Sequence, residues 1–154
     1  MALQKISRRA DERNVAQFIT FRVARQDFAI DATRIRGLLP LHEMTLLERP
    51  NEWVCGITSI RGHDFPVVDL RGKLGILPGS HGRLPCVMVV EAAGARLIGF
   101  IADRVSEVID LRECDFQDGH VRVGGRTRRL LDPDQILSEE ELEKISRLAS
   151  TGLL

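Results

Sequence analysis

The chain has 154 residues, of which 44% are hydrophobic and 29% charged, a composition typical of a globular protein of one domain. Lysine plus arginine and aspartate plus glutamate number 22 each, so the formal net charge is zero and the basic surplus that accompanies nucleic-acid binding is absent. No apolar run reaches the roughly 18 residues of a membrane-spanning helix, and no signal-peptide core follows Met1. We therefore expect a cytoplasmic protein without direct membrane insertion.

Short strands are predicted along most of the chain, because apolar residues alternate with polar ones and the segments end at turn-forming residues. The polar residues 1–14 are expected to form a flexible N-terminal segment, and residues 15–150 a single domain. The expected strands form a first hairpin (17–23 with 28–30), a second hairpin (54–60 with 65–70), a nearly continuous apolar pair (86–91 with 96–102) and a tight turn at 121–126. The apolar pair should be buried on both faces.

A helix is clearly predicted only near the C-terminal end. Ser138 and Glu141 have the spacing of a capping box, and a stripe at helical spacing follows over residues 142–149, which predicts a helix over 138–150. Asp31 is expected to cap a short helical turn that carries Ile35 and Leu38. Many short strands with one terminal helix favour small β-barrels over a parallel α/β sheet.

Catalytic, metal and cofactor sites are not indicated. The three cysteines, Cys55, Cys86 and Cys114, are odd in number and form no CxxC, so we interpret them as small apolar core residues. The four histidines lie in or near polar loops, and no nucleophile elbow, zinc motif or phosphate loop is present. The glycine-rich segment 72–82 lacks the Lys-Ser/Thr step of a phosphate cradle and is predicted to be a flexible loop. We expect no enzyme activity, no metal and no cofactor.

Four segments, taken in order, carry a resemblance to a known family. They are Phe18-Ile19-Thr20-Phe21 with Phe28-Ala29-Ile30-Asp31, Gly56-Ile57-Thr58-Ser59-Ile60-Arg61-Gly62, Pro66-Val67-Val68-Asp69-Leu70-Arg71, and Gly99-Phe100-Ile101-Ala102-Asp103-Arg104-Val105-Ser106-Glu107-Val108. The ordered set, within about residues 17–146, resembles the CheW-like adaptors of bacterial chemosensory arrays. The resemblance implies a mainly β fold of two interlocked five-stranded SH3-like barrels with a C-terminal helix.

The resemblance also implies a non-enzymatic scaffold in a chemotaxis-like signal transduction pathway. Its expected partners are the cytoplasmic tip of a methyl-accepting chemoreceptor and the regulatory domain of a CheA-type histidine kinase. One barrel would bind a kinase domain of similar fold, and the groove between the barrels would receive a helical receptor hairpin. Self-association is a further expectation that stays open, and no nucleic-acid partner is expected.

Eight residues are the predicted protein-binding positions: Ile35, Leu38, Gly56, Arg61, Gly62, Gly99, Val105 and Val108. Two interpretations stay open for most of them. Arg61 contacts a partner, or it caps its turn and pairs with Asp64 or Asp69. The aliphatic residues form exposed edges that face a partner, or they pack in the core. Trp53, the only tryptophan, is interpreted as a core residue rather than an interface anchor.

The chain departs from the family pattern at three places. Gly37 stands where the family often carries a glutamate, the segment 111–123 is shortened, and arginines occupy the last strand near Arg126–Arg129. A divergent module that binds one partner or itself therefore stays an alternative, as does a small β-barrel that binds a ligand or nucleic acid.

Overall fold

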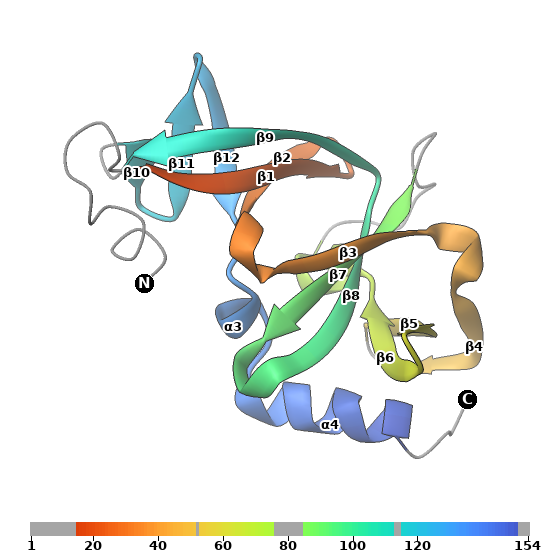
Figure 1. Cartoon of the computed structure of the whole chain (residues 1–154). Helices are drawn as coiled ribbons and strands as arrows, with labels where there is room; N and C mark the ends of the chain where they lie inside the picture. Colours follow the sequence, from red (N-terminus) through yellow and green to blue (C-terminus); the bar gives the residue numbers. More distant parts are fainter. Residues whose placement is uncertain (1–14, 52, 76–84, 113–114, 151–154) are drawn as a thin grey trace.

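The computed structural model describes residues 15–51, 53–75, 85–112 and 115–150. The N-terminal segment 1–14, most of the glycine-rich loop and Cys114 lie outside the described residues. The described chain folds into two curled β-sheets, each of which matches an SH3-like barrel and has two edge strands, with one long helix against the second (Figure 1). None of its helices is long and apolar enough to cross a membrane.

The first barrel is built from the two ends of the described chain. Its strands, in sheet order, are β10 (Phe116–Gln117), β11 (His120–Val123), β12 (Arg126–Leu130), β2 (Gln26–Asp31), β1 (Val15–Val23) and β9 (Arg104–Arg112). The hairpin β1–β2 is antiparallel, with Phe21 opposite Phe28, and the two rings stack at 5.3 Å. Strand β12 joins β2 in parallel, so the C-terminal strands complete a sheet begun by the N-terminal ones.

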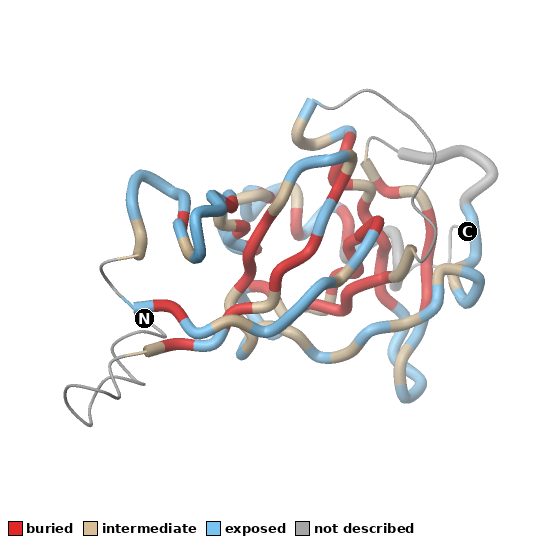
Figure 2. Tube along the Cα trace, turned by 90° about the horizontal axis from the view of Figure 1, so that it is seen from above, coloured by how far each residue is buried: buried red, intermediate tan, exposed pale blue. Residues whose placement is uncertain are grey.

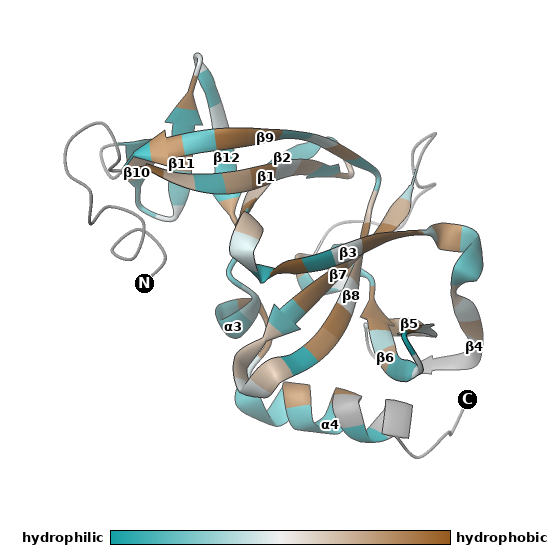
Figure 3. Ribbon diagram, in the orientation of Figure 1, coloured by the Kyte–Doolittle hydropathy of each residue, from teal (hydrophilic) through white to brown (hydrophobic). Residues whose placement is uncertain are grey.

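The second barrel is formed by the middle of the chain. Its strands, in sheet order, are β3 (Ile35–Pro40), β7 (Cys86–Ala92), β8 (Arg96–Ala102), β6 (His63–Val68), β5 (Val54–Ile60) and β4 (Thr45–Asn51). The predicted hairpin β5–β6 and the predicted apolar pair β7–β8 are both confirmed. Residues 87–90 are fully buried, as are Ile98 and Phe100, and Figure 3 shows how hydrophobic these two strands are.

One hydrophobic core is shared by the two barrels. Phe21, Phe28 and Ile30 of the first barrel belong to the same buried cluster as Met88 and Phe100 of the second. The outer face of β1–β2 therefore packs on the second barrel, while its inner face, which includes Phe18 and Ala29, closes a smaller core with β9 and β11. Figure 2 shows the buried segments running through the centre of the molecule. Because the largest buried cluster contains residues of both sheets, the two barrels pack directly against each other.

Helices occupy the ends of strands and the outside of the second barrel. They are η2 (Ala32–Arg34), η3 (Leu41–Glu43), α2 (Leu70–Lys73), η4 (Ala93–Ala95), α3 (Pro133–Ile136) and α4 (Glu139–Ser150). Helix α4 confirms the predicted terminal helix: the Ser138 amide donates to the Glu141 carboxylate at 2.8 Å, and the Glu141 amide donates to the Ser138 hydroxyl at 3.1 Å. Leu142 and Ile145 bury its apolar stripe in the shared core.

Two local predictions are corrected. Asp31 does cap a helical turn, but the turn ends at Arg34, and the predicted helical residues Ile35 and Leu38 lie in strand β3. Strand β3 pairs with the buried strand β7, and this ladder outweighs the weak local helical signal. Each sheet also has six strands rather than the implied five. The two-residue strand β10 extends the first sheet, and Pro40 with η3 separates β3 from β4 at opposite edges of the second.

Candidate protein-interaction surface

Arg61 lies at the tip of the β5–β6 hairpin, in a two-residue turn with Gly62. Both residues have positive φ, 51° and 81°, which matches the primed turns that suit the twist of a hairpin. Arg61 is exposed, and its guanidinium makes no hydrogen bond or ion pair with any described residue. The alternative pairing with Asp64 or Asp69 is therefore not formed; the Asp69 carboxylate instead accepts from the backbone amide of Arg71 at 3.0 Å.

Gly37 is a neighbour of this turn although it is distant in sequence. A Cβ atom at position 37 would lie 3.5 Å from Cδ1 of Ile60, the residue before Arg61, which is an ordinary van der Waals distance. A side chain at this position would thus sit beside the β5–β6 turn.

Gly56 and Gly99 are buried within strands β5 and β8 and are not part of the exposed surface. A Cβ at Gly56 would come within 2.7 Å of the Thr45 carbonyl and closer still to the Met44 side chain. A Cβ at Gly99 would meet Cγ1 of Val87 at 2.6 Å. These glycines let neighbouring strands approach closely, so any part they take in binding acts through the backbone frame rather than a side chain.

The predicted aliphatic contact residues divide into two groups. Ile35 and Val105 are half-buried and pack against the shared core. Leu38 and Val108 are 49% and 58% exposed. The structure adds Leu46, which is 70% exposed and was not among the predicted positions.

All three of these exposed aliphatic residues lie on edge strands. Leu38 is on β3 and Leu46 on β4, the two edges of the second sheet, and Val108 is on β9, an edge of the first. Edge strands carry unpaired backbone donors and acceptors, and most proteins protect them with charged residues. The three residues are therefore candidate positions for contact with another protein.

Arg71 and Asp103 form a buried ion pair between the barrels. Nη2 of Arg71, on helix α2 after β6, lies 2.9 Å from Oδ2 of Asp103, between β8 and β9. The same oxygen accepts from the backbone amide of Ala24 at 2.7 Å, and the Asp103 amide donates to the Arg22 carbonyl. Sequence reasoning did not pair these two residues, which stand 32 positions apart. The pair positions the β1–β2 turn against the second barrel.

The titratable groups of the described residues do not form a candidate metal site. No three His, Cys, Asp or Glu side chains of the described residues lie close enough to hold a metal ion. His42, His63 and His120 are exposed. Burial, with a smaller contribution from Asp69, raises the pKa of the Cys55 thiol to about 12, so this thiol stays protonated near neutrality. Cys55 and Cys86 pack as half-buried residues against the core clusters, which fits their interpretation as small apolar side chains.

The described residues thus form two β-barrels that share one core, with aliphatic side chains exposed on edge strands and, at a hairpin tip, an arginine without a partner among the described residues. The family model of the CheW-like domain matches residues 17–141, and the chain therefore belongs to the CheW-like family.

Individual relatives agree with this assignment. The chain is 24% identical to the chemotaxis protein CheW of Klebsiella aerogenes over 97% of this chain and 98% of the relative, and 24% identical to the chemotaxis protein CheW of Rhizobium meliloti over 82% and 90%. The crystal structure of the scaffolding protein TtCheW from Thermoanaerobacter tengcongensis superposes with a TM-score of 0.71 at 20% identity, covering 80% of this chain and 92% of that one. The predicted family and fold are thus confirmed.

Proposed function

We propose that this protein is a non-enzymatic adaptor in a bacterial chemosensory pathway, where it links the cytoplasmic tip of a chemoreceptor to a CheA-type histidine kinase. Membership of the CheW-like family supports the role, as does the name that its relatives share. The observation that carries the proposal is the position of Leu38, Leu46 and Val108 on edge strands of two barrels that share one core. Both partners are cytoplasmic, so the adaptor would act in the cytoplasm.

The mechanism is geometric. A partner bound at β9 contacts the first barrel, and a partner bound at β3 or β4 contacts the second. Because one core and the Arg71–Asp103 pair connect the barrels, the two partners are held at a fixed relative position. A change in the receptor then alters the placement of the kinase, and a coupling free energy of about 1–3 kcal/mol is sufficient to change kinase activity.

The test is a reconstituted complex of the full chain with a receptor-tip fragment and with the kinase regulatory domain, measured separately. Leu38→Asp, Leu46→Asp and Val108→Asp each place a charge on an exposed edge with little effect on folding. In at least one variant the affinity for one of the two partners should fall by roughly tenfold or more, because apolar contacts at an interface do not tolerate an unpaired carboxylate. Arg122→Gln, an exposed substitution on β11, is the matched control.

The outcome separates the alternatives. Loss of receptor binding in one variant and of kinase binding in another supports the adaptor with two interfaces. If the wild-type chain binds only one of the two proteins, it is a module with a single partner, and if it binds neither, the proposed function is wrong. A sedimentation measurement of the chain alone reports whether it associates with itself.

A further inference from the structure

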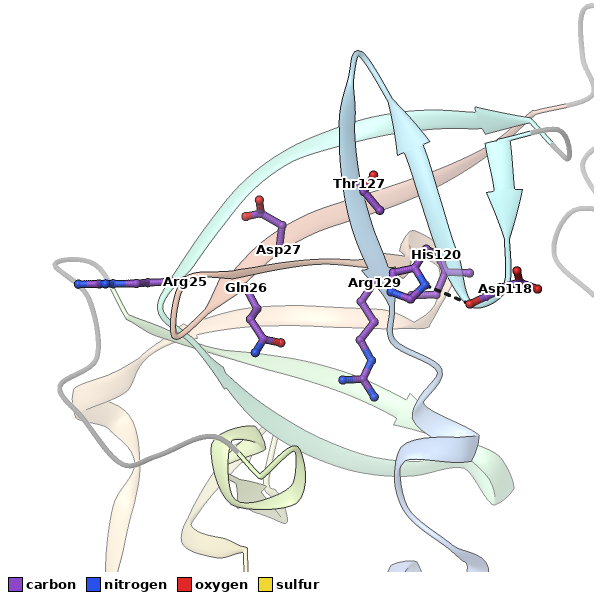
Figure 4. Close-up of a pocket in the computed structure, with 9 residues that line it drawn as sticks. Arg25, Gln26, Asp27, Asp118, His120, Thr127 and Arg129 are labelled. Carbon is purple, nitrogen blue, oxygen red and sulfur yellow. Dashed lines mark hydrogen bonds between the residues drawn. The ribbon is translucent and has the colours of Figure 1, made fainter.

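An open pocket lies on the first barrel, apart from the predicted contact residues. It has a volume of about 840 Å³ and is bounded by the β1–β2 turn, the β10–β11 turn and strand β12 (Figure 4). Its polar lining includes Arg25, Gln26, His120 and Arg129. None of the eight predicted protein-binding residues lines it, and neither does Leu46.

The side chains of the two arginines that line this pocket make no polar contacts within the described fold. Neither Arg25 nor Arg129 makes a hydrogen bond or ion pair with any described residue. Figure 4 shows the side chains of Arg129 and Gln26 extending in the same direction, with the His120 ring beside Arg129 and Arg25 at the rim. Nδ1 of His120 lies 3.0 Å from the Asp118 carbonyl. A carbonyl only accepts, so Nδ1 donates and the ring is held in place.

The two carboxylates near the pocket are directed elsewhere. Asp27 is bound by Arg22 at 3.0 Å and by Arg126 at 2.7 Å. Although burial acts to raise the pKa of Asp27, the hydrogen bonds from these two arginines lower it, so it stays ionised and neutralised. The Asp118 carboxylate extends away from Arg129 in Figure 4. In and around the pocket there are thus four arginines and two aspartates, so the local charge is positive. The arginines are Arg22, Arg25, Arg126 and Arg129.

We propose that this pocket binds a small phosphorylated ligand, whose phosphate group is held by Arg129 together with Gln26. A guanidinium binds phosphate oxygens through two parallel hydrogen bonds. The amide nitrogen of Gln26 donates from another strand, β2, so that Gln26 and Arg129 reach different oxygens, which suits a tetrahedral phosphate better than a planar carboxylate with two oxygens. Arg25, at the rim, adds a second positive charge to the lining of the pocket. The open side of the pocket leaves room for the rest of the ligand.

The test is an NMR titration of the ¹⁵N-labelled full chain with inorganic phosphate at constant ionic strength. We expect saturating shifts confined to the backbone amides of Gln26, Gly119, His120 and Arg129. Arg129→Gln should weaken binding by about fivefold or more, and Arg129→Lys by less, because lysine keeps the charge but loses the paired hydrogen bonds. Arg122→Gln removes a neighbouring exposed arginine outside the pocket and should leave the affinity unchanged. The spectrum of each variant reports whether it is folded.

Three results would overturn the proposal. Phosphate that causes no saturating shift in the pocket shows that there is no site. Equal weakening by Arg122→Gln and Arg129→Gln shows a diffuse ionic effect. A hexaglutamate peptide that binds the same residues more tightly than phosphate assigns the pocket to an acidic segment of a protein. The result is independent of the adaptor proposal, whose test uses other residues.

Discussion

Arg71 and Asp103 meet in the interior, with Nη2 of the arginine 3.0 Å from Oδ1 and 2.9 Å from Oδ2 of the aspartate. Their side chains are only 5% and 11% exposed. The two residues belong to separate segments of the family resemblance, and the structure brings these segments together through one ion pair. The contact joins α2 of the second barrel to the crossing point from β8 to β9, and through Ala24 to the β1–β2 turn.

Arg71→Met should reduce the free energy of unfolding by about 3–5 kcal/mol, because the Asp103 carboxylate stays buried after the guanidinium that balances its charge has been removed. Adding Asp103→Asn should recover part of this loss, since the amide removes the buried charge and keeps an oxygen for the Ala24 amide. Urea denaturation of the two single variants and the double variant measures the coupling. A double variant no more stable than Arg71→Met would contradict this account.

Ile101→Asp should cost about 3 kcal/mol or more, because Ile101 is 3% exposed in β8 and a carboxylate there loses water without gaining a partner. Val108→Asp places the same group on a residue that is 58% exposed and should change stability by only about 0.5 kcal/mol. Thermal unfolding of both variants tests the burial of β8, and similar melting temperatures would mean that the packing is misassigned.

Gly99→Ala should destabilise the protein by about 1–3 kcal/mol, because the new methyl group would lie 2.6 Å from Cγ1 of Val87 and 3.1 Å from Cγ2 of Val67. Gly37→Ala is the matched control, since its methyl group would meet Ile60 at an ordinary 3.5 Å. Chemical denaturation of the two alanine variants should therefore give clearly different midpoints. Equal midpoints would show that β8 shifts to accept the methyl group at little cost.

Arg61→Ala should leave the melting temperature within a few degrees of wild type. It should reduce the affinity for a partner by roughly tenfold, which is ~1.4 kcal/mol of binding free energy. Its guanidinium has no partner among the described residues, so little internal contact is lost. Arg61→Gly should be at least as stable as Arg61→Ala, because φ at this position is +51°. Melting curves and pull-down with each partner measure both effects. Clear destabilisation with normal binding would make Arg61 a structural residue.

Asp134→Asn should lower the melting temperature near pH 7 but not in acid. The hydrogen bond from Arg34, despite the opposing effect of burial and with help from the Ala93 amide, holds the pKa of Asp134 below its ordinary value of 3.8. Because the folded-state pKa is lowered, the stabilisation is present above about pH 4 and is lost as the pH falls through the folded-state pKa. Asp64→Asn is the control, because this position is exposed and the Asp64 carboxylate makes no hydrogen bond with any described residue. A difference that persists unchanged into acid would exclude the ionic explanation.

Local patterns were enough to predict the hairpins β1–β2 and β5–β6, the buried pair β7–β8 and helix α4. In each of these elements, the spacing of the apolar residues indicates which face is buried. A turn or cap residue marks where the element ends, as Gly62 does at one hairpin and Ser138 at the helix. The same patterns did not predict β4 or the full length of β9, and they assigned Ile35 and Leu38 to a helical turn. Edge strands have one unpaired side and a mixed burial pattern, so their alternation is weak.

The sequence by itself therefore determined the class of fold, the family and the central strands, because these depend on the period of apolar residues and on turn chemistry. The tertiary structure decided which residues meet. Arg71 and Asp103 became a pair, Leu46 an exposed edge residue, and Arg129 a neighbour of Gln26, only once β12 had joined β2 and the middle of the chain had closed the second barrel. Contacts between distant segments depend on sheet order and register, which no local pattern of side chains specifies.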